Sequence, residues 1–305
     1  MSDALTGVTH LPHLGVIRVE GADAASFLQG QLTQDFEHLA TGQARLAAYC
    51  TPKGRMQASF IGLKLADGDI VLVMSADILP ATLKRISMFV MRAKAKLRDA
   101  TAEFSLYGVA GDALADIAPT RAGPWSATAS GNATVIGLYP ADGIARALWL
   151  APAGTAAPVG PALSLEAWQA SDIRSGVAMI TAPIVEALVP QMLNYESIGG
   201  VNFKKGCYPG QEVVARSQFR GTLKRRAYLA HSQEAMTAGD EVFHSSDASQ
   251  PCGIVAQAAP SAQGGWDAIV SMQITAAQDG VVTLRSGDGP ALVIEPAPYP
   301  LLEDI

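Results

Sequence analysis

Cysteine is scarce in this sequence. The 305 residues include only three cysteines, Cys50, Cys207 and Cys252, and no two of them form a C-x-x-C pair. An odd number of widely spaced thiols argues against a disulfide framework and is typical of a reducing compartment. Three thiols are also one short of the set that an all-cysteine iron–sulfur cluster requires. We therefore do not expect the chain alone to carry such a cluster.

Long hydrophobic runs are missing as well. Although 49% of the residues are hydrophobic, the longest apolar stretches, 70–74 and 145–152, are far shorter than a membrane span of roughly 18 residues. The first residues lack the basic segment and apolar core of a secretory signal. The sequence therefore predicts a soluble, cytoplasmic protein without membrane contact.

Positive charge is low overall but unevenly placed. The 22 Lys and Arg residues against 28 Asp and Glu give a net charge of −6, which excludes a uniformly basic nucleic-acid coat. Residues 84–98 nevertheless hold six cations and no acid, and residues 204–226 hold seven cations and one acid. Such segments favour an anionic partner, either a polyanionic cofactor tail or RNA. The alternative is that they are solvated faces scattered in space.

Motifs of several common site chemistries are absent. The sequence has no P-loop and no G-x-S-x-G element, which leaves no signal for a nucleotide-phosphate cradle or a serine hydrolase. The histidines show no metal-ligand spacing, so we expect surface histidines and no metal site. They are His10, His13, His38, His231 and His244.

The pattern of apolar residues predicts an α+β fold. Strands are expected at 14–20, 45–50, 55–65 and 70–74, and apolar residues at helical spacing predict a helix over 77–91, followed by an alternating strand over 92–98. An uncharged Ala/Pro/Gly linker at 151–161 precedes a predicted helix at 165–176 and a long irregular stretch at 182–206.

The chain is long enough for two or three domains. From residue 227 onward, short strands separated by turn residues predict a β-barrel. We therefore divide the chain into a region of two interleaved α+β subdomains, 1–226, and a barrel, 227–305.

One block, residues 199–216, differs from its surroundings. Pro209 and Gly210 fit the centre of a type II turn, and Glu212 and Arg216 have the spacing of an ion pair on a short helix that starts at Gln211. Cys207 would then lie just before a turn and near a helix N-terminus. Cations and helix N-termini stabilise a thiolate, the reactive form of cysteine. We therefore interpret Cys207 as a functional thiol rather than a buried core residue, and Cys50 and Cys252 as structural.

The eight residues 205–212, KGCYPGQE, resemble the K-G-C-(Y/F)-x-G-Q-E signature of the YgfZ-like proteins. These are relatives of the glycine-cleavage T-protein, an aminomethyltransferase, and of a mitochondrial iron–sulfur assembly factor. Other stretches agree along nearly the whole chain: FLQGQLTQD at 27–35, Lys53-Gly54, Val189-Pro190-Gln191 and Ile294-Glu295-Pro296.

The resemblance implies a ring of three subdomains around a central channel, with a C-terminal barrel and tetrahydrofolate, or a one-carbon derivative of it, in the channel. It makes Cys207 the essential thiol. The motif frame around this thiol would be Lys205, Gly206, Tyr208, Gly210, Gln211 and Glu212.

The folate-contacting residues are also implied by the resemblance. Trp168 stands where the family has a folate-contacting tryptophan, and an indole is a suitable stacking platform for a pterin or aminobenzoyl ring. Leu14 replaces a second family tryptophan. Asp35 corresponds to the aspartate that the T-protein uses on its folate.

Three functions follow as hypotheses. The first is a folate-binding accessory protein for the assembly or repair of iron–sulfur enzymes, including those that methylthiolate tRNA, with these enzymes or assembly proteins as partners. The second is a folate-dependent aminomethyl transferase. The third is a non-catalytic RNA- or protein-binding module that works through the basic segments.

Overall fold

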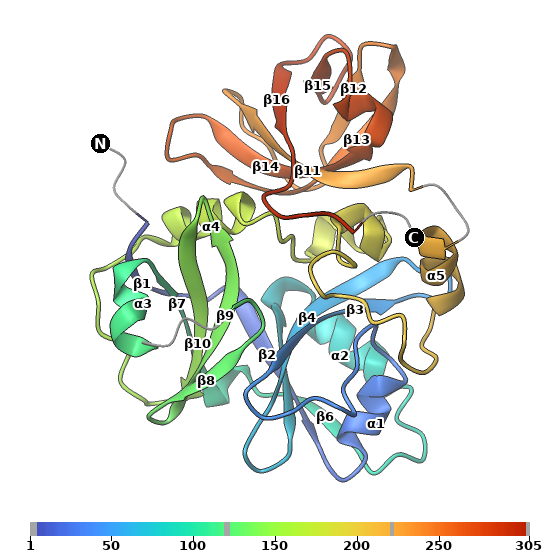
Figure 1. The fold of residues 1–305 in the computed structure, drawn as a ribbon. Helices are drawn as coiled ribbons and strands as arrows, with labels where there is room; N and C mark the ends of the chain where they lie inside the picture. Colours follow the sequence, from blue (N-terminus) through green and yellow to red (C-terminus); the bar gives the residue numbers. More distant parts are fainter. Residues whose placement is uncertain (1–4, 119–122, 220–222, 303–305) are drawn as a thin grey trace.

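A computed structural model of the chain describes residues 5–118, 123–219 and 223–302. Two antiparallel sheets and a closed barrel make up its architecture (Figure 1). The predicted α+β class and C-terminal barrel are confirmed. No helix in the described ranges is long and apolar enough to cross a membrane.

The first sheet contains the strands that the sequence predicts in the N-terminal part. Its strand order is β3-β4-β5-β2-β6, and all neighbours are antiparallel. Strand β5 is buried along its whole length, which explains its nearly continuous apolar sequence. The bounds are β2 (Leu14–Glu20), β3 (Ala44–Cys50), β4 (Met56–Lys64), β5 (Ile70–Ser75) and β6 (Lys96–Asp99).

The helix predicted over 77–91 is shorter in the structure. Helix α1 (Ala24–Gln29) precedes it in the chain and ends before Leu32, whose backbone forms an isolated bridge with Tyr49 of β3. Helix α2 (Leu79–Ser87) follows a 3₁₀ turn and ends well before residue 91. Strand β6 begins only at Lys96, so residues 92–95 are not part of a strand, contrary to the prediction.

The second sheet has the order β1-β7-β10-β9-β8 and carries a small alanine-containing helix, α3 (Asp112–Ile117). Because β1 belongs to this sheet and β2 to the first, the chain crosses between the two sheets within its first twenty residues. The bounds are β1 (Gly7–His10), β7 (Phe104–Ala110), β8 (Ala127–Ser130), β9 (Ala133–Ala141) and β10 (Ile144–Pro152).

The barrel closes in the order β11-β14-β13-β12-β15-β16. It begins at Arg225, two residues before the predicted boundary. The division into regions 1–226 and 227–305 stays a prediction. The strand bounds are β11 (Arg225–Ser232), β12 (Glu241–His244), β13 (Asp247–Pro260), β14 (Trp266–Gln273), β15 (Val282–Leu284) and β16 (Ala291–Glu295).

The segment between the second sheet and the barrel contacts both of them. Helix α4 (Leu165–Arg174) lies between the barrel and the second sheet (Figure 1) and contacts β9, β13 and β14. Residues 182–206 contain only 3₁₀ turns, η3 (Ala182–Ile184) and η4 (Pro190–Leu193), which confirms the predicted irregular stretch. Glu196 of this stretch forms a buried ion pair with Arg226 of the barrel.

Candidate functional site

A cavity of about 660 Å³ lies where the two sheets, helix α4 and the barrel meet. Its volume is within the range of pockets that hold small organic ligands, and most of its wall is apolar. Three of the four tryptophans of the chain, Trp125, Trp168 and Trp266, contribute to the wall. The cavity therefore suits a ligand with a large flat apolar surface.

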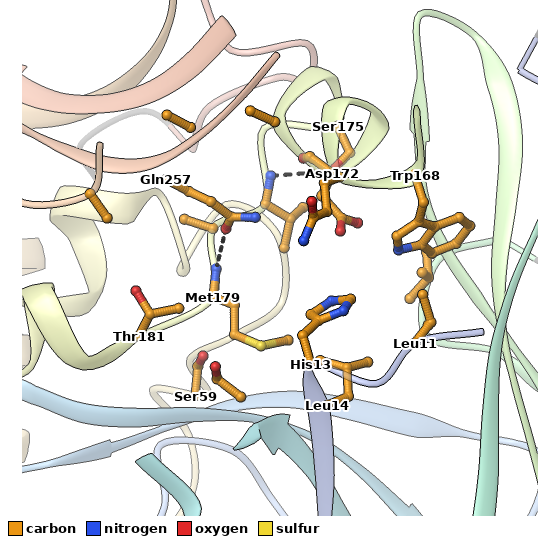
Figure 2. A pocket seen from close by; sticks show the side chains of 18 of the residues that line it. Leu11, His13, Leu14, Ser59, Trp168, Asp172, Ser175, Met179, Thr181 and Gln257 are labelled. Atoms are coloured by element: carbon orange, nitrogen blue, oxygen red, sulfur yellow. Dashed lines mark hydrogen bonds between the residues drawn. The ribbon is translucent and has the colours of Figure 1, made fainter. Parts of the chain in front are cut away.

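Polar groups gather at one end of this cavity. His13 projects into it opposite Asp172 of α4 (Figure 2). Burial lowers the pKa of His13, although the nearby carboxylate of Asp172 works in the opposite direction. The Nδ1 atom of His13 is enclosed and has no hydrogen-bond partner among the described residues. Asp172 forms an ion pair with Arg146. An apolar cavity with a few such groups at one end can orient a ligand as well as hold it.

The position of His13 differs from the expectation that all five histidines lie on the surface. His13 is partly buried in the cavity wall, whereas the other four lie elsewhere. The sequence signal for it is weak, because His13 follows Pro12 in a short turn and has no patterned polar neighbour. Its role depends on Asp172, which comes from a distant helix.

Trp168 and Leu14 both line the cavity, as the resemblance implies for the folate site. Trp168 is only 2% exposed, however. The guanidinium of Arg146 lies 4.3 Å from the centre of the indole ring, and a methyl group added at Gly108 would lie 2.5 Å from the same ring. A ligand in the cavity would therefore meet a limited part of the indole unless Arg146 moves.

The KGCYPGQE motif adopts the local structure that its sequence predicts. Gly210 has a φ of +82°, and the amide of Gln211 donates to the carbonyl of Tyr208 over 3.2 Å, as in a type II turn. Helix α5 (Gln211–Phe219) begins directly after the turn, and Arg216 pairs with Glu212 at 2.9 Å. A side chain at Gly210 would meet the carbonyl oxygen of Thr51 at 2.4 Å, so only glycine fits there.

Lys205 anchors the motif to helix α1. Its ammonium donates to the carbonyl of Gln29 and, over 2.6 Å, to that of Leu32, at the C-terminal end of the helix. The ammonium also lies 4.8 Å from the ring centre of Tyr208. Burial lowers the pKa of Lys205 to about 8, although Asp35, Glu37 and Cys207 oppose the shift. Lys205 thus anchors the irregular segment that carries the thiol.

Cys207 is exposed, whereas Cys50 and Cys252 are buried. Burial raises the pKa of Cys50 to about 12, which is consistent with a structural thiol. Cys207 does not line the cavity. Tyr195 of the cavity wall and Tyr208 of the motif both lie close enough to Cys50 for its charge to affect their pKa values. The exposed thiol therefore lies outside the cavity wall.

Asp35 lies with the motif and not with the cavity. It accepts hydrogen bonds from the backbone amide of His38 at 3.1 Å and is 2.9 Å from the His38 ring. Burial would raise the pKa of Asp35, but these bonds outweigh it and the pKa is lowered. Asp35 also acts on the charge of Lys205. The residues that the resemblance assigns to folate are thus divided between two places.

The buried ammonium of Lys205 gives a testable pH dependence. Its pKa is about 8 in the folded protein and 10.5 in an ordinary lysine, so between these pH values the unfolded chain binds a proton that the folded protein lacks. Stability from this group therefore rises with pH across that window. Urea titrations measure the free energy of unfolding of the wild type and of Lys205→Met at both pH values. The difference between the two proteins is expected to rise by about 1–3 kcal/mol from the lower to the higher pH. This is less than the full pKa shift implies, because solvent screens part of the charge.

The exposed neighbour Lys204 provides the matched control for this measurement. The wild type and Lys204→Met are expected to show parallel stability curves from pH 8 to pH 10.5. Parallel curves for the wild type and Lys205→Met would contradict the assignment.

No group of three or more His, Cys, Asp or Glu side chains suited to a metal ion occurs among the described residues.

Comparison with known proteins gives the family. The model of the GCVT N-terminal domain matches residues 4–123. The tRNA-modifying protein YgfZ of Edwardsiella ictaluri is 32% identical over 301 residues, which cover 93% of this chain and 89% of the relative. The tRNA-modifying protein YgfZ of Photorhabdus laumondii is also 32% identical, over 95% of this chain and 91% of the relative. This chain belongs to the YgfZ family.

The fold is shared with a T-protein. The crystal structure of the glycine cleavage system aminomethyltransferase T from Bartonella henselae matches with a TM-score of 0.71 over 97% of this chain and 86% of that protein. Its sequence identity is 17%, so the likeness concerns the fold. It confirms the predicted T-protein-like arrangement for this YgfZ family member.

Proposed function

We propose that this YgfZ family member binds a reduced folate in its central cavity and supports the modification of tRNA by iron–sulfur enzymes through the thiol of Cys207. The relatives named above are tRNA-modifying proteins, and the chain shares its fold with an aminomethyltransferase of the glycine cleavage system. The observation that carries the proposal is the combination of a tryptophan-lined cavity with a separate exposed thiol in the motif that Lys205 anchors.

The cavity residues fit a folate. A pterin is flat and carries hydrogen-bonding atoms along its edge, and the cavity offers apolar walls with His13 and Asp172 at one end. The buried Nδ1 of His13 and the Nε of Arg146 have no hydrogen-bond partner among the described residues. Both atoms are therefore available to form hydrogen bonds with a ligand. When bound, a folate would supply a one-carbon carrier.

The folate and the thiol would act at different places. Because Cys207 does not line the cavity, a ligand there would influence the motif through the protein and not by contact with Cys207. We therefore interpret the folate as a ligand that stabilises the arrangement in which Lys205 holds the motif. Direct transfer of a one-carbon unit to the thiol is not part of the proposal.

The aminomethyl transferase hypothesis rests on the resemblance to the T-protein and on Asp35 as a residue that acts on folate. Asp35 does not line the cavity. We therefore do not propose transfer chemistry for this chain.

Titration with tetrahydrofolate tests the cavity. Three tryptophans line it, so binding is expected to quench their fluorescence, and calorimetry should give the same affinity. Ala238→Trp, which places a large side chain in the cavity wall, is expected to abolish binding, and His13→Ala to weaken it about tenfold through the loss of a hydrogen bond. Cys207→Ser should bind like the wild type.

A flat calorimetric and fluorescence response of the wild-type protein would remove folate from the proposal. Equal binding by Ala238→Trp and the wild type would place the folate outside this cavity.

A further inference from the structure

The two basic segments of the sequence lie at opposite ends of one short helix. At the start of α1, the amide of Lys94 donates to the side chain of Asp23 over 2.7 Å, and the carbonyl of Lys94 accepts from the amide of Asp23 at 3.1 Å. At the end of α1, the ammonium of Lys205 binds the carbonyls of Gln29 and Leu32. A six-residue helix is about 9 Å long, so the segments are neighbours in space.

Several cations at the two ends of α1 are not neutralised by the protein. They are exposed and form no salt bridge with a described residue, unlike Arg98 and Arg216, which pair with glutamates. Asp35 and Glu37 offset the positive charge near Lys205, so most of the unpaired cations lie at the other end of α1. In the residues that adjoin α1, the unpaired cations are Arg92, Lys94, Lys96 and Lys204.

Part of the second basic segment does not belong to this surface. Arg226 is buried against Glu196, and Arg225 lies on barrel strand β11. Arg220 lies outside the described residues. Arg226 therefore does not contribute positive charge to the surface near Cys207.

Large apolar side chains accompany the exposed cations. Met88, Phe89 and Met91, in the loop that leads from α2 to Lys94, are 62%, 46% and 86% exposed. Near the thiol, Phe219 at the end of α5 is 50% exposed and packs edge-on against Phe203, with ring centres 5.1 Å apart. Exposed aromatic rings among cations are the combination that binds unpaired bases together with their phosphates.

We propose that α1 and the two segments at its ends, with Phe89 and Phe219, form one docking surface for RNA with unpaired bases, and that the RNA passes beside Cys207. The inference rests on the proposed role in tRNA modification and names the substrate surface for it. We call this set of residues the α1 surface.

The composition of the α1 surface favours RNA over two other partners. Three of its four unpaired cations are lysines, which are depleted in protein–protein interfaces but bind phosphates well. Its exposed apolar residues Met88, Phe89 and Met91 lie in a loop after α2 and not on an amphipathic helix of the kind that lies in a membrane surface.

Binding of an unmodified tRNA transcript, measured by fluorescence anisotropy between 50 and 200 mM salt, tests the surface. The logarithm of the affinity is expected to fall linearly with that of the salt concentration. Lys94→Glu and Lys204→Glu, from opposite ends of α1, should each weaken binding and lower the slope by about one. Phe89→Ser should weaken binding about tenfold and leave the slope unchanged.

The matched control changes the same total charge elsewhere. Gln263→Glu combined with Gln278→Glu, in exposed barrel loops, adds two negative charges, as one Lys→Glu change does, and should bind tRNA like the wild type. A second measurement tests whether the bound RNA lies beside Cys207. Saturating tRNA should slow the alkylation of Cys207 by iodoacetamide at least tenfold in the wild type. In Lys94→Glu, the same tRNA concentration should leave the alkylation rate unchanged.

Three outcomes would overturn the α1 surface. They are equal tRNA binding by both lysine variants and the control, no protection of Cys207 at saturation, or preferential binding to phosphatidylglycerol vesicles that the same variants abolish. None of these outcomes depends on the result of the folate titration. A failure of the α1 surface is therefore distinguishable from a failure of the proposed cavity ligand.

Discussion

Replacing Cys207 with serine is expected to abolish the ability of this chain to restore tRNA methylthiolation in a bacterial strain that lacks its own YgfZ. Serine has nearly the size of cysteine, but its hydroxyl does not ionise near neutral pH and cannot act as a thiolate nucleophile or soft metal ligand. Because Cys207 is exposed and its neighbour Gly206 is open to solvent, the substitution removes chemistry and not packing. Mass spectrometry of nucleosides from bulk tRNA measures the modification.

The control for this experiment is another cysteine of the same chain. Cys252→Ala removes a buried thiol of the barrel and should restore methylthiolation, with the cellular amount of each variant checked by immunoblot. Full rescue by Cys207→Ser at wild-type protein levels would exclude the thiol from the function. Rescue by neither variant, with both proteins folded, would show that the chain's role requires more than the one exposed thiol.

Much of the first sheet follows directly from the sequence. The apolar runs of β4 and β5 predict buried strands, and the turn between β3 and β4 follows from its Pro and Gly. The pattern fails where tertiary contacts replace local ones. Val90 continues the helical spacing of α2 but packs against the core from beyond the helix end. Residues 92–95 alternate like a strand, yet the bonds between Lys94 and Asp23 delay pairing until Lys96.

The site could be predicted only in part, for a related reason. A contiguous motif such as residues 205–212 is visible in one line of sequence, including its turn and its helix. The cavity, in contrast, combines His13 from a turn, Asp172 from α4 and Gln257 from the barrel, and no local pattern links them. The proximity of the two basic segments also depends on contacts with α1 that neither segment reveals.

Replacing Trp168 with alanine is expected to lower the free energy of unfolding by about 3–5 kcal/mol in urea titrations, the range for removal of a buried aromatic side chain. Trp168 is 2% exposed, its ring fills the space above Gly108, and Arg146 stacks on it while paired with Asp172. Its loss would leave a void and remove the support of this buried cation.

The same variant would therefore weaken folate binding whether or not the indole contacts the ligand. Trp168→Phe separates the two roles, because a phenyl ring keeps most of the packing, and is expected to cost less than half as much stability. If Trp168→Phe binds tetrahydrofolate like the wild type, Trp168 shapes the cavity wall; if affinity falls at least tenfold while stability is largely kept, the indole contacts the ligand directly. A loss of less than about 1 kcal/mol in Trp168→Ala would contradict the buried packing of this residue.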